Sequence, residues 1–250
     1  MKILNKLVMS VGLLAFAGSA QATLIDFQSL ADGSVGESAW TTFSTSPPYS
    51  VDIDITARSS NGGGESSTDA GTSTYVYFDS GEAGLGVCSS GISGTANDTT
   101  LAGSKANMCG TAGDDNVDVN GETLVFTFNE STSVDGIWFN NNDDADWSLT
   151  GDTVTFSLNG SAATEYAFTA ADALDKPSQS TGLGWYFTFD SIVGIGTNFL
   201  AGDELAIAYG GSNAEQFYIS AIEVPEPALV ALLGLGLVGM GFAQRMKKKA

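Results

Sequence analysis

The amino-acid sequence predicts an all-β protein, an antiparallel β-sandwich with jelly-roll-like connections, between an N-terminal signal peptide and a C-terminal transmembrane helix. From residue 23 to 222, short apolar and aromatic runs alternate with polar residues at a period of two. Clusters of Gly, Ser, Thr, Asn and Asp separate these runs, and no stretch keeps a helical period for three turns. Many short strands between turn-forming clusters are typical of a sandwich.

The strands are expected where the alternation is clearest. In residues 123–128 every second side chain is Leu or Phe, which places the apolar side chains on one face. The dipeptides Asn120-Gly121 and Asn159-Gly160 indicate hairpin turns, and residues 61–72 and 89–105 are expected to be long loops. A division near residue 120 into two smaller sandwiches is the alternative. The predicted strands are 24–27, 49–57, 73–78, 123–128, 134–139, 153–158, 165–168, 185–189, 205–209 and 216–222.

The N-terminal 22 residues have the features of a secretory signal peptide. Lys2 and Lys6 supply positive charge, residues 7–17 are apolar, and Ala20-Gln21-Ala22 is a small-residue cleavage pattern. Thr23 is then expected to begin the mature chain. The alternative is an uncleaved N-terminal anchor, but the apolar stretch is short for one.

The C-terminal segment contains a second uncharged stretch, residues 228–243. Within it Gly234–Gly239 fit the G-x-G-x-x-G pattern of dinucleotide-binding turns, but no acidic residue follows them. As a helix, these 16 residues would be about 24 Å long, slightly short of a bilayer core of about 30 Å. The sequence therefore predicts a transmembrane helix. The basic residues that follow it are expected to act as a cytoplasmic stop-transfer signal: Arg245, Lys247, Lys248 and Lys249.

The order of three features, Val224-Pro225-Glu226-Pro227, a short Gly/Leu-rich span and a basic cluster, resembles the PEP-CTERM sorting signal. This tail has also been called the "ice-binding protein C-terminal" domain, which does not imply ice binding. The resemblance implies an exosortase substrate of a Gram-negative bacterium that makes exopolysaccharide, processed near the prolines and delivered to the cell surface or extracellular matrix. Residues 223–250 are assigned to this signal, 23–222 to the sandwich and 1–22 to the signal peptide.

The composition excludes several classes of function. Between residues 23 and 224 there are 28 acidic residues and three basic ones, Arg58, Lys105 and Lys176, which gives a net charge of −25. Such a charge repels nucleic acid, so no nucleic-acid partner is expected. The chain has no histidine, which excludes Ser-His-Asp and Cys-His catalysis and histidine-ligated zinc.

The two cysteines, Cys88 and Cys109, are both in the exported region. In an oxidising compartment they are expected to form a disulfide. Two thiols without histidine do not favour a metal site, and the C-x-x-C spacing of redox proteins is absent.

Acidic side chains cluster at residues 52–54, 114–118 and 140–146. Oxygen-rich loops at the ends of a sandwich are possible Ca²⁺ sites, although 140–146 does not fit the EF-hand pattern. A solvated acidic surface is the alternative, and the alternation around Asp52 and Asp54 favours the wet face of a strand there. The candidate calcium ligands are Asn142, Asp143, Asp144 and Asp146.

Trp138 and Trp147 flank the 140–146 loop and are candidate glycan contacts, because aromatic rings stack on sugars and amides bind hydroxyl groups. Core packing of these tryptophans is the alternative. The sequence thus predicts an exported structural or carbohydrate-binding component, without enzyme activity, whose partners are an exosortase and extracellular polysaccharide. The rival is a glycan-cleaving enzyme that uses a carboxylate pair, but no acid pair stands out by its spacing.

Overall fold

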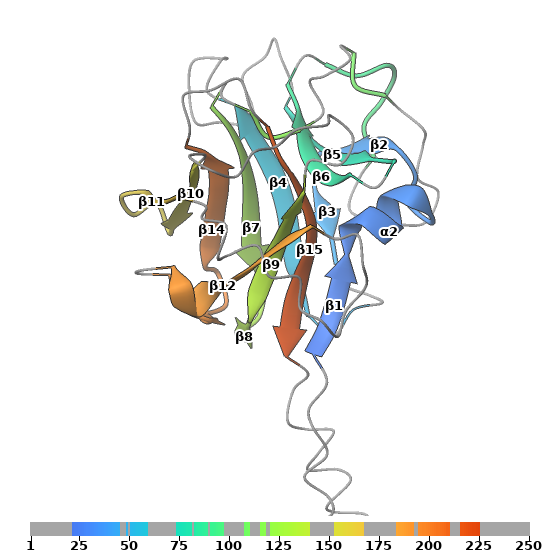
Figure 1. The fold of residues 1–250 in the computed structure, drawn as a ribbon. Coiled ribbons are helices and arrows are strands. Elements are labelled where there is room, and N and C mark those ends of the chain that lie inside the picture. The colour runs from blue at the N-terminus through green and yellow to red at the C-terminus, as the bar shows by residue number, and fades with distance from the viewer. Residues whose placement is uncertain are drawn as a thin grey trace, which may run out of the picture. The chain divides into compact units, whose positions relative to one another are not determined.

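In the computed structural model, residues Leu24–Val224 form one compact unit (Figure 1). A second unit comprises Met1–Thr23 and Pro225–Ala250, of which only residues 22, 23 and 225 are described. The structure describes residues 22–45, 49, 51–59, 74–81, 83–89, 91–97, 108–110, 116–118, 121–140, 153–167, 184–192, 195–210 and 216–225.

The first of two large sheets has the last strand of the domain, β15, near its middle. β15 pairs with β9 on one side and with β6 and β1 on the other (Figure 1). The order is β12 (Trp185–Thr188), β9 (Gly136–Asn140), β15 (Tyr218–Pro225), β6 (Gly84–Cys88), β5 (Tyr75–Asp79) and β2 (Ser38–Trp40), with β1 (Ala22–Asp26) beside β15.

The second sheet packs against the first and contains most of the regular alternation seen in the sequence. Every pairing in it is antiparallel, and β7 lies between β4 and β14. The order is β11 (Thr164–Ala167), β10 (Thr153–Leu158), β14 (Glu204–Tyr209), β7 (Glu122–Phe128), β4 (Ile53–Ser59) and β3 (Phe43–Ser44).

Three smaller elements complete the described fold. α2 (Phe27–Asp32) begins after Asp26, whose side chain accepts a hydrogen bond of 2.8 Å from the Ser29 N–H and so caps the helix. A 3₁₀ turn, η2 (Phe189–Ser191), follows β12. A two-stranded sheet pairs β8 (Thr132–Ser133) with β13 (Asn198–Phe199).

The core lies between the two sheets and follows directly from the period-two pattern. In the second sheet Ile55, Phe126 and Leu205 are register partners across three strands, and all three are buried. From the first sheet Phe139 reaches across to Phe156, with ring centroids 6.3 Å apart and nearly perpendicular planes. Burying one such side chain contributes about 1.5–3 kcal/mol, so the interlocked inner faces hold the sheets together.

The comparison with the predicted strands confirms two antiparallel sheets packed as a sandwich. β10 has the predicted bounds, and strands from both sides of residue 120 pair within each large sheet, which excludes two separate sandwiches. The predicted strand 24–27 is wrong at its end, because Phe27 begins α2. The jelly-roll connectivity stays a prediction.

The ends of the chain are described only in part. Ala22, the last residue of the predicted signal peptide, is the first residue of β1. The rest of that peptide, the predicted transmembrane helix at 228–243 and the basic residues Arg245 to Lys249 lie outside the described residues. Within the described part of the chain, no helix is both long and apolar enough to cross a bilayer.

Candidate functional site

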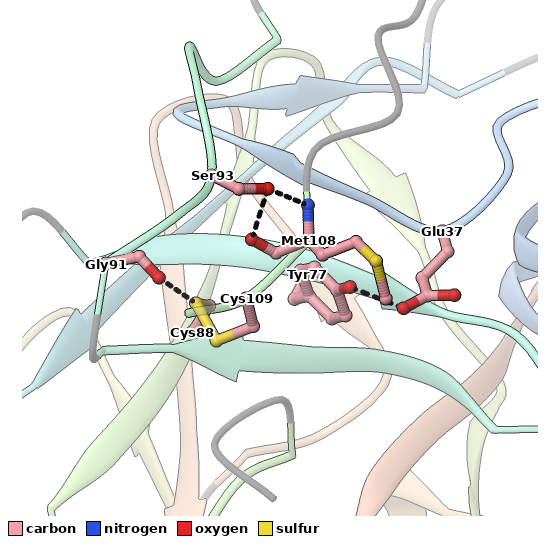
Figure 2. The surroundings of a disulfide bond; sticks show 7 residues. All are labelled: Glu37, Tyr77, Cys88, Gly91, Ser93, Met108 and Cys109. Atoms are coloured by element: carbon pink, nitrogen blue, oxygen red, sulfur yellow. Dashed lines mark hydrogen bonds between the residues drawn. A yellow bond between two sulfur atoms is a disulfide. The ribbon is translucent and has the colours of Figure 1, made fainter. Parts of the chain in front are cut away.

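The predicted disulfide between Cys88 and Cys109 is present (Figure 2). It connects the end of β6 to a short ladder in which Ser93 N–H donates to Met108 C=O at 2.9 Å and Gly110 N–H donates to Gly91 C=O at 2.7 Å. The disulfide therefore fixes both ends of the loop between residues 88 and 109, and this covalent link suits the oxidising compartment expected for an exported protein.

The same region covers part of the outer face of the first sheet. Cys88, Ala39 and Tyr77 form a buried cluster on this face, and Ile92 and Cys109 pack against it. The Tyr77 hydroxyl donates a hydrogen bond of 2.9 Å to Glu37 (Figure 2). Burial, and then this bond to a carboxylate, raise the pKa of Tyr77 far above its usual value of 10.

Trp138 lies on the outer face of β9, but its side chain is only 1% exposed. The ring packs on Tyr186, with centroids 4.3 Å apart, and on Ala221 and Leu24. A buried indole has no free face for a sugar ring, so Trp138 is a packing residue and the expectation of a glycan contact there is corrected. Trp147 lies outside the described residues.

The candidate calcium ligands Asn142, Asp143, Asp144 and Asp146 also lie outside the described residues. Among the residues that are described, no group of three or more acidic or cysteine side chains could hold a metal ion.

Asp52 and Asp54 lie on the solvent-facing side of their segment, as predicted. Both are half-buried, whereas the alternating Ile53 and Ile55 are fully buried. Their carboxylates are bridged by one side-chain amide. Asn129 Nδ2 donates to Asp52 at 3.1 Å and to Asp54 at 3.0 Å. The Asn129 amide therefore connects the two carboxylates of this acidic pair.

A small cavity lies in the described part of the sandwich core. It has a volume of about 10 Å³ and lies between the two sheets, with a fully apolar lining. Such a void is smaller than any organic ligand and its surface gives water no partners. Its lining residues are Phe126, Phe128, Val134, Ile137, Phe189, Leu205, Ile207 and Ile222.

A larger space, a groove with both polar and apolar lining, lies on the second sheet. Its volume is about 450 Å³, within the range of small-molecule and glycan sites. Strands β4, β7, β10 and β14 contribute side chains, and the turn between β10 and β11 closes one side. The lining residues are Arg58, Ser59, Gly121, Thr123, Ser157, Gly160, Ser161, Ala163, Glu204 and Ala206.

The turn that borders the groove has a defined shape. Asn159 and Gly160 both have positive φ, 53° and 67°, and Ser161 N–H donates to Leu158 C=O at 2.9 Å. This is the geometry that an Asn-Gly hairpin turn requires, and it confirms the predicted turn. Asn159 also joins the turn to β14, since its Oδ1 accepts a hydrogen bond of 2.8 Å from Glu204 N–H.

Among the residues that the structure describes, one ion pair crosses the groove, between Arg58 and Glu204. Nη2 of Arg58 lies 3.3 Å from Oε2 of Glu204, and the two side chains are 39% and 45% exposed. Arg58 is also the only basic residue of the described sandwich. The groove therefore has hydroxyl groups, a guanidinium and a carboxylate that face solvent, with no aromatic ring among its described lining residues.

No pattern in the sequence predicts this groove. Its lining residues come from positions 58 to 206, and small side chains such as Thr123 and Ala206 carry no recognisable motif. The one available signal was Arg58, a rare positive charge in a strongly acidic domain.

The start of the predicted sorting motif lies in the fold itself. Glu223, Val224 and Pro225 are the last three residues of β15. The Glu223 carboxylate accepts a hydrogen bond of 2.6 Å from the Tyr186 hydroxyl. Burial, followed by this hydrogen bond, raises the pKa of Tyr186 far above its usual value. Glu226 and Pro227 lie outside the described residues.

Comparison with known proteins identifies one feature. Residues 223–248 match the PEP-CTERM protein-sorting motif, which confirms the resemblance seen in the sequence. The match covers 26 of 250 residues and concerns sorting alone. It implies that the protein is exported and processed by an exosortase. No curated protein and no solved structure matches the chain.

Proposed function

We propose that this protein, which carries a PEP-CTERM motif and is exported for sorting, is a non-enzymatic component of the cell surface or extracellular matrix that binds polysaccharide. The observation that carries the proposal is the groove over β4, β7, β10 and β14 of an exported sandwich, whose lining includes hydroxyl groups, Arg58 and Glu204. Hydroxyl, guanidinium and carboxylate groups are the kinds of group that bind sugar hydroxyls. The groove has room for a few sugar rings.

The charge of the domain favours a neutral glycan. The Glu204 carboxylate offsets the Arg58 charge within the groove, and the surrounding domain carries a net charge of −25. A polyanion such as a uronic-acid polymer is repelled at low ionic strength. A neutral chain avoids that repulsion and donates hydroxyls to Glu204 while it accepts from Arg58. Without an aromatic platform the affinity per site is expected to be low, so long chains with several binding units are retained best.

Binding of the purified 23–224 fragment to neutral and acidic oligosaccharide arrays tests the proposal. The single variants Arg58→Gln and Glu204→Gln should each reduce retention of the bound glycan at least fivefold, because each removes one of the two charged groups. Asp190→Asn is the matched control, since Asp190 is an exposed acid on η2 and outside the groove. Equal binding by all variants, or no binding to any array member, would refute the role of the groove.

The same material tests the rival enzyme. A binding component returns the oligosaccharide at its original length after prolonged incubation, as mass spectrometry can show. Recovery of shortened oligosaccharide would favour a glycan-cleaving enzyme with a carboxylate pair. Calcium binding at residues 142–146 is a separate proposal, and a comparison of melting temperatures in Ca²⁺ and in Na⁺ tests it.

A further inference from the structure

The sorting motif and the folded sandwich share three residues. The motif match begins at Glu223, whereas β15 ends at Pro225. Glu223 and Val224 therefore belong both to the segment that defines the motif and to a strand of the first sheet. This overlap concerns the residues immediately before Glu226 and Pro227, near which the resemblance to PEP-CTERM proteins implies processing.

Glu223 is held on the outer face of the sheet. Its side chain is 3% exposed, and its carboxylate accepts the 2.6 Å hydrogen bond from Tyr186. Its backbone C=O accepts a hydrogen bond of 2.8 Å from Asp135 N–H. Gly136 makes this arrangement possible, because a Cβ at that position would lie 2.5 Å from the Tyr186 ring. Tyr186 can therefore reach across β9 to the end of β15.

Val224 is held on the opposite face. Its side chain is 1% exposed and belongs to the main hydrophobic core. Because adjacent strand residues point to opposite faces, the two residues are fixed from both sides of the sheet. A partner that contacts either side chain must first remove the end of β15 from the sheet.

Enzymes that act on peptide segments bind them in extended form, through main-chain hydrogen bonds and pockets for alternate side chains. In β15 the main chain of Glu223 is paired with Gly136 of β9, and the side chains of Glu223 and Val224 are buried. We propose that the sorting enzyme binds residues 223–225 in the detached state, so that folding of the sandwich and binding of the enzyme compete for the same segment. The rate of processing of the folded protein then depends on how often the end of β15 opens.

This inference rests on sorting by an exosortase and is independent of glycan binding. Its first test is Tyr186→Phe, which removes the hydroxyl that binds Glu223 and retains the ring that packs on Trp138. A buried hydrogen bond to a charged group corresponds to about tenfold or more in a local opening equilibrium. Pulse-chase labelling in a host with the exosortase should show processing of this variant about tenfold faster than wild type.

Tyr77→Phe is the matched control. It removes a comparable tyrosine–glutamate hydrogen bond, the one to Glu37, from the same sheet, but in β5 rather than at the end of β15. General destabilisation would accelerate processing of both variants equally. The proposal expects acceleration in Tyr186→Phe alone, with the unprocessed precursor measured by intact mass.

A second variant retains the buried Glu223 and Val224 in β15. The seven residues Gly-Ser-Gly-Ser-Gly-Glu-Val are inserted between Val224 and Pro225, so that a second Glu-Val pair precedes Pro225 outside the sheet. Its processing should be faster than wild type, and adding Tyr186→Phe should produce no further change. Equal rates for wild type, Tyr186→Phe and the insertion variant would overturn the proposal, and so would absence of processing in all of them.

Discussion

Removal of the Cys88–Cys109 disulfide should lower the stability of the sandwich by about 3 kcal/mol. The two cysteines are 21 positions apart, so the bond closes a loop of 22 residues including both ends. In the chain-entropy description, confining a loop of this length in the unfolded state corresponds to about 3 kcal/mol at 25 °C. The perturbation is the double variant Cys88→Ala with Cys109→Ala, which prevents any exchange of thiols.

The loss should be visible as a change in melting temperature. For a domain of 150–250 residues, 1 kcal/mol corresponds to about 2–4 °C, so Tm should fall by about 6–12 °C. Differential scanning calorimetry of the 23–224 fragment measures this directly. Urea denaturation should show a lower midpoint and a slope that is equal or larger, because the unlinked chain exposes at least as much surface on unfolding.

A decrease of less than 2 °C would refute this reasoning. It would mean that the hydrogen bonds among Gly91, Ser93, Met108 and Gly110 persist after unfolding and already confine the loop. Alternatively, it would mean that the disulfide stabilises the folded state only through the packing of its sulfur atoms. The reduced wild-type protein is the control for cavity formation. It retains both sulfur atoms, so its melting temperature should lie close to that of the double variant if loop closure is the main effect.

Three further predictions concern alkaline stability, the core and calcium. Folding raises the pKa of Tyr77 and Tyr186, so the stability that these two hydroxyl groups contribute is complete below pH about 10 and is lost as pH rises above it. Urea denaturation at increasing pH should show the unfolding free energy falling by up to about 1.4 kcal/mol per pH unit for each tyrosine. The decrease should be smaller in the variants Tyr77→Phe and Tyr186→Phe. Phe139→Ala should cost about 3–5 kcal/mol in urea denaturation, since this buried ring contacts three others, whereas a loss below 1 kcal/mol would contradict the packing described. If Ca²⁺ binds residues 142–146, millimolar Ca²⁺ should raise Tm more than ionic-strength-matched Na⁺ does, and Asp144→Ala with Asp146→Ala should abolish the difference. Identical melting curves would exclude the site.

The sequence was most informative where apolar residues alternate without glycine. β10 and β7 follow such runs, and their inner residues meet the core as expected. β6 was missed because two of its five residues are glycines and leave little pattern. The structure explains one of them, since a Cβ at Gly84 would lie 2.7 Å from the Ile219 carbonyl oxygen of β15. α2 was missed because its six residues are too few to show a helical period.

The candidate sites depend on tertiary contacts that alternation does not encode. Trp138 was a candidate glycan contact because it flanks residues 140–146, with core packing as the alternative, and Tyr186 from another strand packs over it. In the groove on the second sheet, Arg58 contacts Glu204, which is 146 positions away in the sequence. Period and spacing describe neighbours along one strand, whereas these contacts depend on which strands become adjacent. The sorting motif was predictable because it is a continuous segment.

The position of β15 near the middle of its sheet also determines when that sheet can form. β15 is the last strand in the chain, yet β9 on one side and β6 and β1 on the other hydrogen-bond to it. During vectorial export, β1 and β9 emerge from the translocation pore long before the strand that separates them. Until residues 218–225 arrive, these strands expose unpaired edges, which are prone to pairing with other chains. We therefore expect the exported chain to depend on rapid translocation or on a chaperone that covers those edges, and a chain arrested before residue 218 should aggregate rather than accumulate as a folded intermediate.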